Sequence, residues 1–332
     1  MLSRRHVVGG LSLLGAGALL PSLTVTAAED RLETTAVRLV QDPSTCVAPE
    51  YVVEDLLRAE GFREIGYVEV ASDADDQKML NENKADFALD FALKFVTAID
   101  AGDPLTVLSG VHAGCFELFA RDSIRNIRDL KGKSIGGDAI GASGPAFLVS
   151  LGAAIGFDAV RDVRWVIESK PSPMQRFIDG ELDAFLAHPP EVQQLRARRI
   201  GHVLVSSSSD RPWSQYFCCM LGARSDYVRK YPVATKRVVR ALLRAADICS
   251  SDPAGAARHL VERKITDDYD AALDTVRDIH FDRWRDYDAE DTMRFYALRL
   301  HEAGMIISTP AKIIAKGTDW RFFNEVRREL KT

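Results

Sequence analysis

The sequence has little of what marks several common classes of protein. Beyond residue 28 it contains no apolar run near the ~20 residues that a membrane-spanning helix needs. Its formal net charge of −5 gives no excess of positive charge, so nucleic acid and anionic membrane surfaces are not expected partners. The G-x-S-x-G nucleophile motif and the H-E-x-x-H metal motif are both absent. Hydrolase chemistry therefore has no support in the sequence.

Cysteine is scarce and irregularly spaced. An odd number of cysteines without C-x-x-C spacing predicts neither a disulfide framework nor a zinc site, although a single bridge is left open. Cys218 and Cys219 are adjacent on a predicted strand, so they are expected to point to opposite faces, one of them as a small core residue. The five cysteines are Cys46, Cys115, Cys218, Cys219 and Cys249.

Residues 1–28 are expected to be an export signal and not part of the fold. Arg4 and Arg5 precede an apolar run, residues 7–20, and the small residues 24–28 have the pattern of a signal peptidase site. The paired arginines resemble a twin-arginine signal, and Sec export is the alternative. The expected location of the mature chain is the periplasm.

The stretch 129–148, DLKGKSIGGDAIGASGPAFL, predicts a short strand, a glycine-rich loop and a helix start. Pro145 suits the first helical position, and Ser143 can cap the free amides in front of it. Such a helix start favours a small anion. Ala142 stands where a P-loop needs lysine, and the glycines do not fit G-x-G-x-x-G. Nucleotide binding is disfavoured, and no cofactor is expected.

Short apolar runs alternate with helical patterns along the chain, which predicts an α/β fold with mainly parallel strands. The chain from residue 232 onward is expected to be nearly all helical, with inward-facing stripes on two of its helices. The expected strands are 36–40, 66–70, 85–89, 105–109, 134–135, 162–167, 182–186, 203–205 and 217–221, and the stripes are Val238, Leu242 and Ala245, then Phe295, Leu298 and Leu300.

The motifs Asp129–Lys133, the Gly-Ala-Ser-Gly helix start at 141–144 and Gly180–Ala184, in that order, resemble the substrate-binding proteins of ABC importers in the nitrate, sulfonate and taurine group. The resemblance covers the whole mature chain. It implies a type II periplasmic-binding-protein fold, in which two α/β lobes are joined by two crossings and close over a ligand. The implied organisation is a signal peptide at 1–28, lobe 1 at 29–120 plus 222–332, and lobe 2 at 121–221.

The resemblance places ligand contacts at strand ends and helix starts that face the cleft, in agreement with the general rule for open α/β sheets. Ser143 is the favoured contact for an oxyanion. Each other candidate has a structural alternative: Asp42, Asp90 and His112 as caps or turn residues, Trp213 and Tyr216 as core aromatics. The expected site comprises Asp42, Thr45, Asp90, His112, Ser143, Gly144, Ser169, His188, Glu191, Trp213, Gln215 and Tyr216, with Phe91 and Gly114 at the same strand ends.

The expected function is capture of a small polar or anionic organic solute, without catalytic residues or a metal, and delivery by a monomer to an ABC permease and its ATPase. If Asp42, Asp90 and Glu191 face the cleft, the ligand also carries a cationic or hydrogen-donating group, as an amino acid or heterocycle does. Two alternatives stay open. One is an enzyme, since the same family includes a thiamine-pyrimidine synthase, and the other is a protein that presents its ligand to a membrane sensor.

Overall fold

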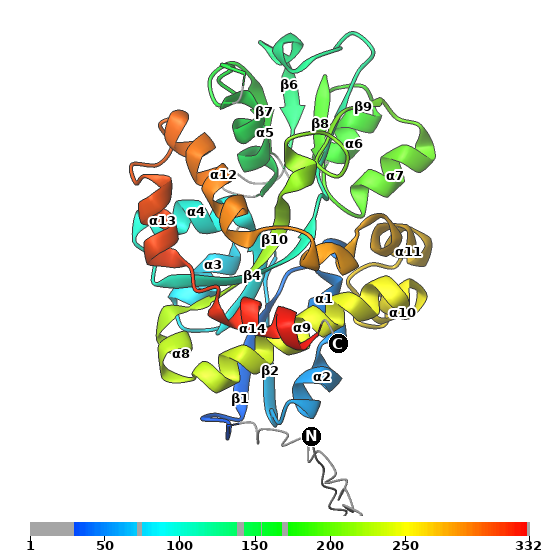
Figure 1. The fold of residues 1–332 in the computed structure, drawn as a ribbon. Coiled ribbons are helices and arrows are strands. Elements are labelled where there is room, and N and C mark those ends of the chain that lie inside the picture. Colours follow the sequence, from blue (N-terminus) through cyan, green and yellow to red (C-terminus); the bar gives the residue numbers. More distant parts are fainter. Residues whose placement is uncertain (1–29, 72–74, 138–142, 154, 168–171, 331–332) are drawn as a thin grey trace, which may run out of the picture. The chain divides into compact units, whose positions relative to one another are not determined.

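Two five-stranded sheets organise the computed structural model (Figure 1). It describes residues 30–71, 75–137, 143–153, 155–167 and 172–330. The expected export signal lies outside these residues. Within them, no helix combines the length and apolarity that a membrane crossing requires.

The first sheet has the strand order β2-β1-β3-β10-β4. Strand β1 is parallel to β2 and β3, whereas β10 is antiparallel to β3 and β4. All five residues of β3 are buried, as expected for a strand covered on both faces. The strands are β1 (Ala36–Gln41), β2 (Glu64–Glu69), β3 (Phe87–Phe91), β4 (Leu105–Ala113) and β10 (Phe217–Arg224), and the helices between them are α1 (Ala48–Val52), α2 (Glu54–Ala59), α3 (Asp76–Asn81) and α4 (Ala92–Ala101).

The second sheet has the order β7-β6-β8-β5-β9 and repeats the same pattern. Strand β6 is parallel to β7 and β8, and β5 is antiparallel to β8 and β9. Its strands are β5 (Glu117–Ala120), β6 (Ser134–Gly136), β7 (Arg164–Val166), β8 (Ala184–Ala187) and β9 (His202–Ser206), with helices α5 (Ser143–Ala153), α6 (Pro173–Ile178) and α7 (Glu191–Arg198).

The antiparallel strand of each sheet is the one that follows a crossing from the other sheet. Strand β5 pairs only within the second sheet, and all of β10 pairs within the first. The lobe boundary expected after 120 therefore falls at the far end of β5, and that expected after 221 falls within β10, whereas the strand pairing puts the crossings before Glu117 and Phe217. We retain the division into lobes as a proposal with these earlier boundaries.

The chain beyond β10 is helical. Val238, Leu242 and Ala245 of α9 are fully buried, as the apolar stripe predicts, whereas Leu298 of α12 is 37% exposed. Leu298 was wrongly placed because α12 buries Met293, Tyr296, Ala297 and Leu300, which share a face that excludes it. The helices are α8 (Ser225–Lys230), α9 (Pro232–Ser251), α10 (Pro253–Glu262), α11 (Tyr269–Asp278), α12 (Ala289–Glu302), α13 (Pro310–Gly317) and α14 (Arg321–Glu329).

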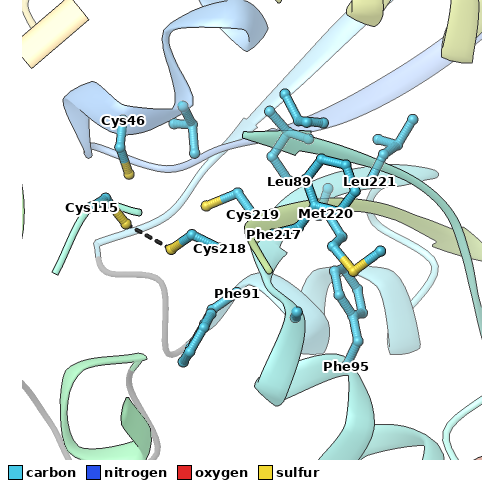
Figure 2. Close-up of a cluster of buried hydrophobic side chains, with 14 of the residues drawn as sticks. Cys46, Leu89, Phe91, Phe95, Cys115, Phe217, Cys218, Cys219, Met220 and Leu221 are labelled. Carbon is cyan, nitrogen blue, oxygen red and sulfur yellow. Dashed lines mark hydrogen bonds between the residues drawn. The ribbon is translucent and has the colours of Figure 1, made fainter. Parts of the chain in front are cut away.

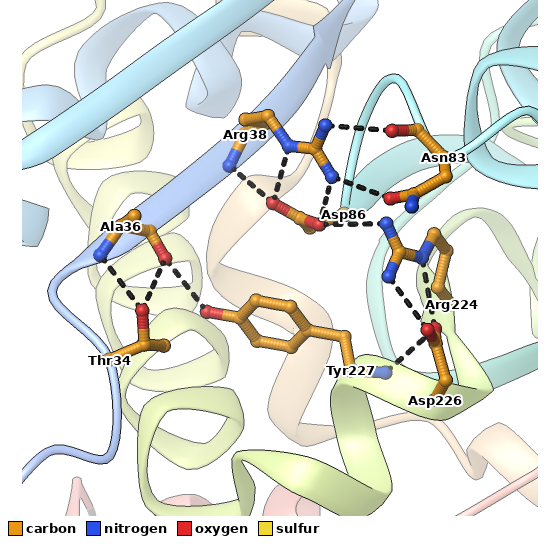
Figure 3. A network of polar contacts seen from close by, with 8 residues as sticks. All are labelled: Thr34, Ala36, Arg38, Asn83, Asp86, Arg224, Asp226 and Tyr227. Atoms are coloured by element: carbon orange, nitrogen blue, oxygen red, sulfur yellow. Dashed lines mark hydrogen bonds and ion pairs between the residues drawn. The ribbon is translucent and has the colours of Figure 1, made fainter.

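A polar network fixes the amino ends of the parallel strands in the first sheet (Figure 3). Asp86, which precedes β3, is 5% exposed and lies 2.7 Å from Arg38 of β1 and 3.3 Å from Arg224 of β10. The hydroxyl of Tyr227 donates to the carbonyl of Ala36 at 3.2 Å. The opposite, carboxyl ends of β1 and β3 border a cavity.

Candidate ligand-binding site

A cavity of about 180 Å³ lies at the carboxyl ends of the strands. Residues that follow β1 and residues at the carboxyl end of β3 meet residues from the second-sheet side there, which is the usual position of a ligand in an open α/β sheet. The residues lining it are Asp42, Pro43, Ser44, Cys46, Val47, Ala71, Asp76, Leu89, Asp90, Phe91, Cys115, Phe116, Ser143, His188 and Cys219.

One wall of the cavity is acidic. Asp42, Asp76 and Asp90 are 3%, 1% and 2% exposed. Neither carboxylate oxygen of Asp76 has a hydrogen-bond partner among the described residues. Burial, and then repulsion from Asp90 and Asp42, raises the pKa of Asp76 well above its usual value. A donor group on a ligand would relieve this cost.

Part of the negative charge of the acidic wall is compensated by neighbouring groups. Lys94 Nζ lies 3.0 Å from Asp90 Oδ2, and Asp42 Oδ1 accepts the backbone N–H of Ser44 at 2.6 Å. Behind the wall, Glu50 accepts the N–H of Leu89 at 2.8 Å, and burial raises the pKa of Glu50 well above its usual range. Carboxyl groups therefore outnumber cations on this side of the cavity.

A second wall is formed by thiols (Figure 2). Cys46, Cys115 and Cys219 line the cavity, and Sγ of Cys218 lies 2.7 Å from Sγ of Cys115. Cys218 and Cys219 both turn toward this cluster, contrary to the expectation of opposite faces. The reason is an irregular register between β10 and β4 at Phe217, Cys219 and Met220, which breaks the regular alternation of a strand.

The thiols have unequal acidities. Hydrogen bonds from Cys115 and Cys219, with a further contribution from His112, lower the pKa of Cys46 well below the usual value. Burial raises the pKa of Cys115 and of Cys218. The arrangement stabilises a thiolate at Cys46, next to the cavity.

Aromatic rings complete the wall. Phe91, expected at a strand end of the site, is one of them, whereas Trp213 and Tyr216 are not among the described lining residues. Phe91 and Phe116 line the cavity with their centroids 5.2 Å apart, and Phe147 stacks on Phe116 at 5.3 Å. Trp213 packs on Phe147 from outside, edge to face at 6.1 Å, and is 7% exposed. Trp213 is a core residue that supports the wall, which is the structural alternative named for it above.

Two residues from the second-sheet side reach the cavity. Ser143 is the first residue of α5 and is 6% exposed, so it lies within the helix and not before it as a cap. His188 follows β8, and its Nδ1 lies 3.1 Å from the carbonyl oxygen of Pro189. That carbonyl also accepts the hydroxyl of Ser44 at 3.3 Å. The two sides therefore touch at the edge of the cavity.

The structure brings four of the twelve expected site residues into the cavity wall, namely Asp42, Asp90, Ser143 and His188. Ser169 lies outside the described residues. The hydroxyl of Thr45 faces Thr275 at 3.4 Å, and His112 is fully buried with Phe281 edge-on at 5.3 Å. The residues that lie outside the wall formed by the described chain are Thr45, His112, Gly144, Glu191, Trp213, Gln215 and Tyr216.

Three of these residues, Glu191, Gln215 and Tyr216, have local reasons to lie elsewhere. Tyr216 stacks on Phe295 with centroids 4.0 Å apart and rings 10° from parallel. Gln215 ends a short 3₁₀ turn and is exposed. Glu191 begins α7 and lies 3.8 Å from the imidazole of His188, behind the cavity wall.

Several lining residues were missed. Asp76 follows the second strand, and the acidic run 73–76 at a strand end was a usable signal. Cys46 lies four positions after Asp42, and Cys115 is next to Gly114, yet neither position was assigned to the site. The convergence of Cys46, Cys115 and Cys219 has no sequence signal, because the fold alone brings them together.

Solved structures with the same fold include binding proteins and an enzyme. The alkanesulfonate-binding protein SsuA from Xanthomonas axonopodis pv. citri, bound to MOPS, has a TM-score of 0.69 and 16% identity over 87% of this chain and 100% of its own. The periplasmic nitrate-binding protein NrtA from Synechocystis PCC 6803 has a TM-score of 0.69 and 13% identity over 91% and 90%. The desulfurization enzyme DSZB has a TM-score of 0.59 and 16% identity over 89% and 99%.

These likenesses confirm the predicted type II periplasmic-binding-protein fold with its two α/β sheets. No curated protein matches the sequence. The family described as NMT1/THI5 like matches residues 59–256, which is more than half of the 332 residues. The chain therefore belongs to the NMT1/THI5-like family.

Proposed function

We propose that this protein is the exported substrate-binding component of an ABC importer. It captures a small polar organic solute between two lobes, residues up to 116 plus 217–332 and residues 117–216, and delivers it as a monomer to a membrane permease and its ATPase. The family match and the fold support this role, since two proteins that share the fold are named for binding an alkanesulfonate and nitrate.

The observation that carries the proposal is the carboxylate of Asp76, buried in the cavity wall with no hydrogen-bond partner among the described residues. A buried polar group without a partner costs free energy, so a ligand that donates to it binds favourably. Asp42 and Asp90 add acceptors on the same side. The sequence left a polar or an anionic solute open, and the acidic wall favours a solute with a cationic or hydrogen-donating group.

The remaining lining residues indicate which chemical groups the solute carries away from the acidic wall. Ser143 is at the amino end of the 11-residue helix α5, which favours an acceptor or carboxylate. Phe91 and Phe116 offer a flat apolar surface between the two polar ends. A zwitterion or an amino-substituted heterocycle that fits about 180 Å³ has the matching chemistry.

The test is a thermal-shift screen of the purified protein with amino acids, aminopyrimidines, carboxylates, alkanesulfonates and nitrate. A ligand at ~100 times its Kd stabilises the native state by roughly 2.7 kcal/mol, which gives a clear shift in Tm. Positive compounds are expected among those with a donor or cationic group, and Asp76→Asn is expected to abolish their shift. Binding of nitrate or a simple sulfonate, unchanged in Asp76→Asn, would contradict the proposal.

The thiol of Cys46, which lies beside the cavity and has a lowered pKa, favours a second candidate, an enzyme of this fold. The pKa of Cys46 is lowered by its thiol neighbours, which is the condition for a nucleophile. The two functions differ in the fate of the solute. Mass spectrometry of each compound after prolonged incubation should recover it unchanged, whereas a converted product that disappears in Cys46→Ala would establish the enzyme.

A further inference from the structure

Three sulfur atoms meet in the cavity wall from three separate parts of the chain (Figure 2). The Sγ atoms of Cys46, Cys115 and Cys219 all lie within 4.8 Å of one another, and all three side chains are buried. Cys46 comes from the turn after β1, Cys115 from the segment between β4 and β5, and Cys219 from β10. The sequence predicts no metal site because these positions have no regular spacing, but the fold supplies the proximity.

Two further donors lie next to the three sulfurs. Cys218 contacts Cys115 through sulfur atoms 2.7 Å apart. His112 is paired with Cys219 across β4 and β10, and its imidazole lies close enough to Cys46 to affect that thiol. His112 is fully buried, and neither ring nitrogen has a hydrogen-bond partner of normal geometry among the described residues. Buried polar groups are normally hydrogen-bonded, so apolar packing alone does not explain why both ring nitrogens of His112 lack a partner among the described residues.

We propose that Cys46, Cys115 and Cys219 bind a thiophilic d¹⁰ cation, Zn²⁺ or Cu⁺, in the cavity wall. With a metal–sulfur distance of about 2.3 Å, two sulfurs of a tetrahedral site lie about 3.8 Å apart, so small rotations of the cysteine side chains close the site. Thiolates select Zn²⁺ and Cu⁺, whereas Mg²⁺ and Ca²⁺ require oxygen ligands.

The three sulfurs supply three ligands, which leaves a fourth position. All three cysteines line the cavity, so this position is open to a solute or water. Three protein ligands and one open position is the pattern of zinc sites that act on a ligand, and four protein ligands that of structural ones. The inference concerns the thiol wall and does not depend on which solute the acidic wall binds.

The first measurement is the metal content of the purified protein, prepared anaerobically with reductant, stripped with a chelator and reloaded with Zn²⁺ or with Cu⁺ in separate samples. One ion per chain is expected after gel filtration, and a competing chromophoric chelator then gives the affinity for each ion. Loading with Co²⁺ should produce the intense visible and near-ultraviolet absorption of a tetrahedral thiolate site. A metal content near zero for both ions would overturn the proposal.

Matched variants separate a specific site from general thiol binding. Cys46→Ser and Cys219→Ser are expected to weaken metal binding by more than the roughly 10- to 100-fold that loss of an outer-shell partner costs. Cys249→Ser is the control, because Cys249 is equally buried but lies on α9, outside the sulfur cluster. Equal affinity in all three variants would contradict the site, and far-UV circular dichroism establishes that each variant is folded.

A disulfide is the competing outcome for two of the thiols. Cys115 and Cys218 are close enough to be joined by an oxidant, and in that state Cys115 cannot bind a metal. Intact-mass measurement of protein purified in air, without reductant, distinguishes the two. Bound metal with all five thiols retained supports the site, whereas a mass lower by two hydrogens with no metal overturns it. Solute binding by the chelator-treated protein tests the proposed function separately.

Discussion

The ammonium group of Lys94 lies 3.0 Å from Oδ2 of Asp90, and both side chains are almost completely buried at the carboxyl end of β3. Lys94 is four residues further along the chain, in the first turns of α4, so the strand-to-helix connection itself forms the pair. The pair partly neutralises an acidic wall that Asp42 and Asp76 share. Removal of the Lys94 ammonium group therefore tests how much the stability of the folded protein depends on this one cation.

We expect Lys94→Met to lower the free energy of unfolding by about 3–5 kcal/mol, because it removes the buried cation that pairs with the carboxylate of Asp90. Urea denaturation at neutral pH measures the change. Lys84→Met is the matched control, since Lys84 lies 2.6 Å from Glu82 but the two side chains are 56% and 40% exposed. The control should change stability by no more than about 1 kcal/mol. Similar losses in both variants would show that burial of the Lys94 pair has no special weight.

Asp76→Asn is expected to stabilise the protein at neutral pH while it removes solute binding. Burial raises the folded-state pKa of Asp76, so the ionised group destabilises the native state. The sign follows from linkage: stability is fully present below the unfolded pKa of about 3.9 and is lost as pH rises through the higher folded-state pKa. The variant should therefore exceed the parent at pH 7 and approach it near pH 4.

The groups that face Asp76 are Asp42, Glu50, Asp90 and Lys94, and all of them remain in the variant, so the difference between the two stability curves isolates residue 76. Asp86→Asn serves as the control. Asp86 is buried between Arg38 and Arg224, and its neutralisation should reduce stability at neutral pH (Figure 3). Destabilisation of the protein by Asp76→Asn at pH 7 would mean that the carboxylate has a favourable partner. That result would contradict the expectation that the ionised group destabilises the native state.

Periodicity predicted most of the strands and helices, because each is a local pattern of apolar residues. Local periodicity does not predict the sheet to which a strand belongs, because that depends on its long-range partners. Glu117 pairs opposite Ala187 and Ser206, and nothing local in the run 115–120 specifies those partners. The crossings were consequently expected too late in the chain, one at the end of β5 and one within β10.

The same distinction explains the site. Asp42 and Asp90 were predicted because strand ends are visible in the sequence, and both lie in the cavity wall. Trp213 has polar neighbours that suggested exposure, but the ring is held against Phe147 by contacts distant in sequence. The sulfur cluster depends on three long-range approaches and on an irregularity in β10, and none of these is encoded by spacing.

Gly222 of β10 is predicted to be intolerant of any side chain. A Cβ at this position would lie 2.2 Å from Cε1 of Phe95, which packs from α4 onto the strand. Gly222→Ala should therefore cost about 1–3 kcal/mol through overpacking. Combining it with Phe95→Leu should recover part of the loss, so the double variant is more stable than the sum of the single effects predicts. Strict additivity in denaturant unfolding would show that the two positions do not compete for space.

Asp278 links the helix tail to the second-sheet side of the cleft. Its Oδ2 accepts from Gln193 at 3.2 Å and lies 3.2 Å from Nη1 of Arg196, both on α7. Arg196 is also bound to the buried Glu117, so its guanidinium is held in place without Asp278. The contacts of Asp278 with α7 therefore join the two proposed lobes directly. Their loss should favour opening of the lobes.

We expect Asp278→Ala to weaken binding of the best compound from the screen by up to roughly fivefold, since a half-exposed ion pair is worth at most about 1 kcal/mol. The loss should shrink at high salt, which screens the parent's ion pair. Asp286→Ala is the control, because Asp286 pairs with Arg283 at 3.1 Å within one turn of the tail and spans no cleft. Calorimetry at low and high salt measures the affinities. Scattering of the solute-bound variant should give a larger radius of gyration than that of the parent. An unchanged affinity and radius would mean that this contact does not bias closure.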